Sequence, residues 1–139
     1  MKRTYPVIFT EDKKEILVEV PDLGVITEGE NLENAIEMAR DAISIAIVSR
    51  EDNKEKVPSP SRINSIDIVN STFYKKNKSF VSIVDVDVEE YRRKVDTRPV
   101  RRNVSLPSWL NYEAEKAGIN VSGVLQKALM ETLKLGNRY

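Results

Sequence analysis

The chain contains neither cysteine nor histidine among its 139 residues. Without cysteine it can form no disulfide, no thiolate metal site and no thiol nucleophile. Without histidine it lacks the commonest metal ligand and the usual general base, which disfavours most hydrolytic mechanisms. We therefore expect no catalytic residue, no metal site and no cofactor, and a protein that is not an enzyme.

Long apolar runs are also absent. No run approaches the roughly 18 residues that a membrane-spanning helix needs. The opening Met-Lys-Arg-Thr-Tyr-Pro lacks the apolar core of a signal peptide. We expect a cytoplasmic protein without a membrane partner. Its 40% hydrophobic residues are enough to build one domain or two small ones.

The net charge is zero, but charge of either sign is unevenly spread. Residues 98–139 carry seven Lys or Arg against three Glu, which gives plus four, whereas residues 11–41 carry ten Asp or Glu against three Lys or Arg, which gives minus seven. A basic end and an acidic segment indicate two partners of opposite charge. Acidic loops and helix faces that merely keep a domain in solution would produce the same imbalance.

The most informative segment that is present covers residues 100–106, which alternate polar and apolar side chains as a strand does. Pro107 cannot donate to a strand ladder and is expected to end it. The pattern predicts two opposite faces: an outward face with Arg101, Asn103 and Ser105, and an inward face with Val104 and Leu106. One face can be buried while the other contacts a ligand.

Two short amphipathic helices are predicted after this strand. Ser108 is expected to cap the first, which begins near Trp109 and stops at Gly118. Asn120 is expected to cap the second, which ends at Gly136. A strand and two helices are too small to bury their apolar faces alone, so the unit should dimerise by pairing its strand with that of a second copy. The predicted dimer core is Val104, Leu106, Leu110, Val124, Leu125 and Leu129.

This segment resembles a ribbon-helix-helix domain through Arg-x-Asn-Val-Ser-Leu-Pro, the turn Gly-Ile-Asn-Val-Ser and the apolar helix that follows. The resemblance implies a two-stranded ribbon in the DNA major groove, with Arg101, Asn103 and Ser105 facing the bases. It also implies a phosphate at the start of the second helix, near Asn120, Val121 and Ser122. Arg102 falls on the face that should be buried and is expected to reach a phosphate from the ribbon end. A solvated sheet edge is the alternative reading of such a strand.

The N-terminal part is predicted to be a small sheet domain covered by one helix. Short β-rich runs cover residues 5–10, 16–20, 25–27 and 80–88. The clearest amphipathic pattern follows Asn31, and residues 51–64 form a loop. The fold class is therefore α+β, with a sheet domain at 1–90, a linker at 91–99 and a C-terminal domain at 100–139. The polar segment 89–99 is expected to be helical near 90–94.

The order of these pieces is similar to that of the HicB antitoxin family over nearly the whole chain. The hallmarks are Tyr-Pro-Val-Ile-Phe from Tyr5, Val-Pro-Asp-Leu-Gly from Val20, Thr-Glu-Gly from Thr27, Val-Asp-Val-Asp from Val84 and Tyr-Arg-Arg from Tyr91. Residues 67–78, rich in Lys, depart from the acidic loop that the family would place there. The resemblance implies a partial RNase H-like domain that masks a small basic RNA-cleaving toxin, HicA. It also implies that a ribbon-helix-helix homodimer, or a tetramer of such chains, binds double-stranded operator DNA and represses its own operon.

Two alternatives to an antitoxin are compatible with parts of the sequence. RNase H chemistry would need carboxylates around two metals, for which the candidates are Asp85 and Asp87 with Glu19 or Asp22. Alternating carboxylates on an outward strand face are usually solvated, which disfavours catalysis. A stand-alone ribbon-helix-helix transcriptional regulator without a toxin partner is the other alternative, and the sequence leaves it open.

Overall fold

The computed structural model describes residues 2–136, and the chain divides into two compact units, Met1–Val95 and Asp96–Tyr139. Among the described residues no helix combines the length and the apolar character that crossing a bilayer requires. The elements are β1 (Lys2–Asp12), β2 (Glu15–Val20), β3 (Val25–Gly29), α1 (Leu32–Asp52), η1 (Ile63–Ser65), β4 (Ser79–Asp87), α2 (Val88–Val95), α3 (Ser108–Ala117) and α4 (Val121–Leu133).

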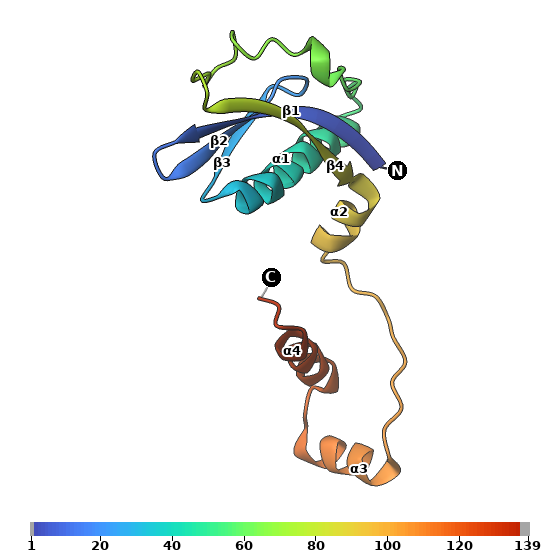
Figure 1. Cartoon of the computed structure of the whole chain (residues 1–139). Coiled ribbons are helices and arrows are strands. Elements are labelled where there is room, and N and C mark those ends of the chain that lie inside the picture. Colours follow the sequence, from blue (N-terminus) through green and yellow to red (C-terminus); the bar gives the residue numbers. More distant parts are fainter. Residues whose placement is uncertain (1, 137–139) are drawn as a thin grey trace. The chain divides into compact units, whose positions relative to one another are not determined.

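The first unit is a four-stranded antiparallel sheet in the order β3-β2-β1-β4, with α1 packed on one face (Figure 1). The α+β class is confirmed, as are the four strands and the helix after Asn31, whose side chain accepts the Asn34 amide. Pro6 is accepted in a central strand because β2 pairs with β1 only from Ile8 onward, so β1 has one neighbour at that point.

The core lies between the sheet and α1. Strand alternation points Tyr5, Val7 and Phe9 of β1 toward the helix, where they are buried with residues of β2 and β4. The buried stripe of α1 recurs every three or four residues, as a helix that lies on a sheet requires. It consists of Ala35, Ala39, Ile43, Ala46 and Ile47.

Residues 53–78, which we call the strap, start beside the core, where the Tyr5 hydroxyl donates to the Pro58 carbonyl at 2.7 Å, and then cross the opposite face of the sheet (Figure 1). β1 is buried on both of its faces, and Ile8 and Thr10 point away from α1. Two carboxylates hold the strap in the same way: each accepts a backbone N–H and a hydroxyl from one residue. Asp22 binds Ser61, with distances of 2.8 Å to the amide and 2.5 Å to the hydroxyl. Glu19 binds Thr72, with 3.1 and 2.5 Å.

The segment predicted as a polar tether begins with α2, so its expected helical turn near 90–94 is present and longer than predicted. Arg92 of α2 bonds Asp52 at the end of α1 at 3.0 Å, which ties α2 to the first unit. Tyr91 is partly buried, and this burial raises the pKa of its hydroxyl. The chain leaves the first unit only after α2.

The second unit corrects two helix boundaries of the sequence prediction. Ser108 does not cap α3; it is the first helical residue, and Pro107 occupies the cap position without a side-chain bond. The last helix ends at Leu133 rather than Gly136, because Lys134 adopts a left-handed φ of 56° and its amide turns back to Glu131. Residues 100–106 form no strand within the single chain. A strand is defined by bonds to a neighbour, and the expected neighbour is the same segment of a second copy.

Candidate nucleic-acid interface

The turn between α3 and α4 contains two helix-capping residues that the sequence predicted. Gly118 ends α3 with a left-handed φ of 66°, and its amide returns to the helix carbonyls of Ala114 and Glu115. Asn120 caps α4 by accepting the Gly123 amide at 3.2 Å. Gly123 suits this turn because an added Cβ would lie only 3.0 Å from the Asn120 side chain. The start of α4 is therefore well defined.

The predicted phosphate contacts lie at this start. The Gly123 amide donates to the Asn120 side chain. The amides of Val121 and Ser122 lie in the first turn of α4, where an amide has no acceptor within the helix. All three predicted residues, Asn120, Val121 and Ser122, are exposed. A helix N-terminus with free amides favours an anion through its dipole.

The predicted base-reading side chains, Arg101, Asn103 and Ser105, are all exposed on the segment before α3, as is Arg102. In the single chain this segment has neither helical nor strand structure. The structure therefore leaves the strand register and the assignment of these residues as predictions.

The predicted dimer core is uncovered. Val124 is 58% exposed, Leu129 49% and Val104 52%, and Leu125 is only half-buried. None of the described residues of the second unit is fully buried. A group of apolar side chains of this size on a small unit is typical of an association surface.

The acidic candidates for metal chemistry do not converge. Arg40 of α1 binds the Asp85 carboxylate at 2.9 Å and holds the pKa of that group below its ordinary value. Asp87 accepts the Glu90 amide at 3.2 Å, and Glu19 and Asp22 hold the strap. Across residues 2–136 no cluster of three or more acidic or other metal-binding side chains is positioned for an ion.

Sequence reasoning missed the role of Asp22 and Glu19 as strap anchors. Their partners lie 39 and 53 residues away, in a segment without periodicity. The one signal in the sequence was the length of that loop, because long loops in a small domain usually need anchors or a function.

Comparisons with known proteins cover both units. A family model described as HicB_like antitoxin of bacterial toxin-antitoxin system matches residues 5–128. The chain belongs to the HicB-like antitoxin family. The family is one of antitoxins, in agreement with a protein that is not an enzyme.

Two solved structures from toxin-antitoxin systems are also similar to this chain. A chain of a toxin–antitoxin complex from Streptococcus pneumoniae is 27% identical, with a TM-score of 0.62, over 95% of this chain and 99% of that one. The crystal structure of the antitoxin HicB from Burkholderia pseudomallei is 26% identical, with a TM-score of 0.50, over 97% of this HicB-like chain and 99% of that one. No curated protein matches.

Proposed function

We propose that this HicB-like protein neutralises a HicA-like mRNA-cleaving toxin and represses its own operon by binding operator DNA as a dimer. The observation that carries the DNA-binding half is the uncovered apolar surface of the second unit. Burying one Val or Leu side chain contributes roughly 1.5–3 kcal/mol, and six such residues are predicted to face a second copy. A dimer would bury them and pair the two 100–106 segments as antiparallel strands.

The ribbon formed in this way presents Arg101, Asn103 and Ser105 from both copies. The major groove admits a two-stranded ribbon, and these side chains suit base edges: Arg can bond guanine, Asn adenine, and Ser either base. Backbone amides at the start of α4 would hold a phosphate on each side. The basic charge of residues 98–139 adds attraction that is independent of sequence.

The first unit supplies the toxin-binding half. A toxin that cleaves RNA must attract a polyanion and is expected to be basic, whereas residues 11–41 carry the strongest acidic excess of the chain. Similarity to a chain of a toxin–antitoxin complex supports a protein partner. We propose steric inhibition, in which the antitoxin covers the toxin without performing chemistry.

The test uses the full chain and the small basic protein encoded beside it, each purified separately. The protein should form a stable complex, and RNA cleavage by the toxin should stop at saturating antitoxin. A fragment carrying the promoter of the operon should also be retarded. If no neighbouring toxin exists or its cleavage is unchanged while the promoter is still bound, the protein is a stand-alone ribbon-helix-helix regulator instead.

A further inference from the structure

One part of the sheet face opposite α1 is left open at its β2–β3 end. In the antiparallel register Leu17 lies opposite Glu28, and Glu19 lies opposite Ile26, so these side chains share one face. Ile26 is 59% exposed, although it lies in the middle of a strand. We call the surface made by Glu15, Leu17, Ile26, Glu28 and Glu30 the open corner.

We propose that the open corner is the docking site for a basic, partly apolar segment of the toxin, with a Lys or Arg side chain seated among its carboxylates. This inference rests on the proposed function, because it locates the surface that the toxin covers. It goes beyond the proposed function because it assigns the toxin contact to the β2–β3 end of the sheet face opposite α1.

The first argument is the contrast with the rest of the same face. Where the strap crosses, Glu19 and Asp22 are occupied by hydroxyl and amide donors of the strap itself. Glu15 and Glu28 instead face one another: a side-chain hydrogen bond with Glu28 and, after it, the repulsion of the Glu28 charge raise the pKa of Glu15. Two like charges held together on rigid strands disfavour the free protein, and an incoming cation would relieve the repulsion.

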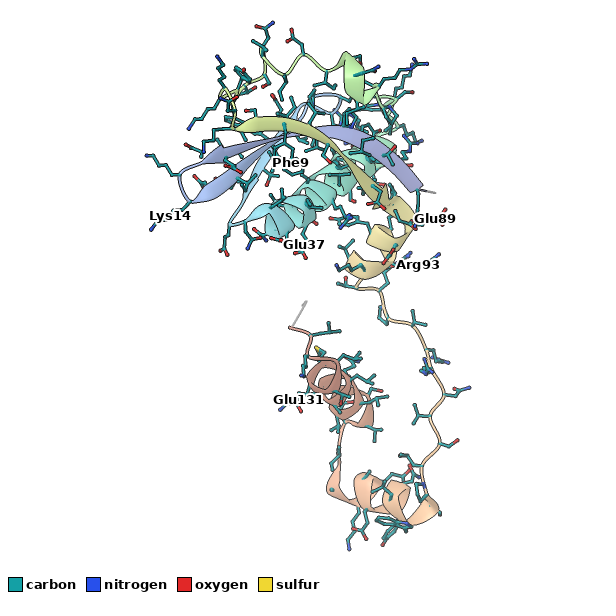
Figure 2. The ribbon with its side chains drawn as sticks, viewed as in Figure 1. Phe9, Lys14, Glu37, Glu89, Arg93 and Glu131 are labelled. Atoms are coloured by element: carbon teal, nitrogen blue, oxygen red, sulfur yellow. The ribbon has the colours of Figure 1, made fainter. Side chains whose placement is uncertain are left out.

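The second argument is shape. A cavity of about 710 Å³ adjoins the corner, and its lining includes the carboxylates of Glu15, Glu28 and Glu30, Met38 of α1, and the two lysines of the hairpin, Lys13 and Lys14. Figure 2 shows Lys14 projecting at the tip of the β1–β2 hairpin, beside this region. The cavity offers a thioether and carboxylates together, which suits the long apolar stem and cationic head of Lys or Arg. Ile26 provides the apolar contact next to it.

The partner is therefore specified by chemistry as a protein segment with at least one cation flanked by apolar side chains. Charge complementarity selects it over nucleic acid, since the three carboxylates that line the cavity outnumber its two lysines. A second copy of this chain fits less well, because its corner would bring the same carboxylates.

Single cysteines test the location, since the chain contains no cysteine of its own. Ile26→Cys and Ile83→Cys place one thiol each on the same sheet face; Ile83 lies on β4, at the far edge, and is 52% exposed. Thiol alkylation of each full-length variant is followed with and without the separately purified HicA-like toxin. We expect saturating toxin to slow alkylation about tenfold in the Ile26→Cys variant, as for a side chain at an interface centre, and to leave the Ile83→Cys variant unchanged.

A second pair of variants tests the charge. Glu15→Gln combined with Glu28→Gln should weaken toxin binding about tenfold through faster dissociation, as expected for a lost charge contact at an interface. Glu55→Gln, beyond the opposite end of α1, should leave affinity unchanged. Because the substitutions remove repulsion, the melting temperature of the double variant should not fall.

The outcomes separate the two proposals. If the parent chain neither binds nor inhibits the toxin, the proposed function fails and this inference fails with it. If the parent inhibits the toxin while Ile26→Cys remains as reactive as before, the function stands and the open corner is not the contact. Equal protection at positions 26 and 83 would likewise overturn the assignment to this end of the face.

Discussion

Gly29 at the end of β3 lies directly against Ala35 in the first turn of α1. A Cβ atom added at Gly29 would come within 2.4 Å of the Ala35 backbone nitrogen and 2.5 Å of its Cα, distances that no side chain tolerates. The obstacle is backbone, so it cannot rotate away. This contact sets how closely the helix follows the strand into the core.

We expect Gly29→Ala to destabilise the first unit by roughly 1–3 kcal/mol, the usual cost of forcing extra atoms into a packed site. Urea unfolding followed by circular dichroism measures the change. Gly136→Ala is the matched control, since a Cβ there meets nothing within 4 Å. Equal stability of the two variants would show that α1 can shift away from β3.

The two strap anchors should act together. Removing both carboxylates, with Asp22→Ala and Glu19→Ala, takes away four hydrogen bonds to Ser61 and Thr72. The strap should then be cut by trypsin about tenfold faster than in the parent, because proteolysis follows the population of the open form. Ser59→Ala, on an exposed neighbouring residue, should have no effect. Unchanged cleavage would mean that the remaining contacts, among them the Tyr5–Pro58 hydrogen bond and the Lys75–Asp12 ion pair, hold the strap without these two anchors.

The carboxyl of Asp96 should titrate at an unusually low pH. The Arg98 guanidinium, at 2.7 Å, lowers the pKa of this carboxyl from 3.8 to about 2. Because the folded pKa is depressed, any stabilisation from the pair is present above 3.8 and lost as pH falls toward 2. NMR titration of the full chain should show this, and Arg98→Ala should return the carboxyl toward its ordinary value. An unshifted titration in the parent would mean that the pair does not persist in solution.

Operator binding should depend on single side chains of the ribbon. Arg101→Ala and Asn103→Ala should each cost about 1–3 kcal/mol and relax specificity at one base pair. Their folding should be unaffected, since both positions are exposed. Gel retardation with a set of single-base operator variants measures both effects. If both proteins bind the parent operator with unchanged affinity, the predicted strand register is wrong.

The dimer core should respond differently from the ribbon. Leu106→Ala or Leu125→Ala removes a side chain from the proposed shared core, at a cost of roughly 2–5 kcal/mol if that site is fully packed in the dimer. We expect sedimentation to show a shift toward monomer at low concentration, with loss of operator binding as a consequence. Tyr112→Ala, on an exposed side chain of α3 outside the predicted core, is the control. A dimer equally stable in all three variants would place the interface elsewhere.

The sequence predicted the first unit well where periodicity is strong. The stripe of α1 and the alternation of β4 are local patterns imposed by burial, and both agree with the sequence prediction. Helix ends were predicted less well, since Ser108 and Pro107 are both suited to the start of α3 and only the backbone angles distinguish them. The pairing of Asp22 with Ser61 depends on two distant segments meeting, which no local pattern encodes.

The candidate DNA site is predicted to the extent that its residues follow a spacing rule. Asn120 and Gly118 have strict conformational preferences and lie where expected. The strand predicted at 100–106 is different, because a strand needs a neighbouring strand and the single chain offers none to this segment. When a segment takes up a conformation only within an assembly, the contacts of that assembly determine the conformation, and a single chain does not show it.

Arg40 has a further effect through its bond to the main chain. Its Nε donates to the Asp85 carbonyl at 3.2 Å while the same guanidinium binds the carboxylate. β4 is the terminal strand of the sheet, and a terminal strand whose polar backbone groups are free recruits strands from other molecules. Arg40 occupies one main-chain acceptor of this terminal strand and places charge beside it, which makes β4 a poorer template for an added strand.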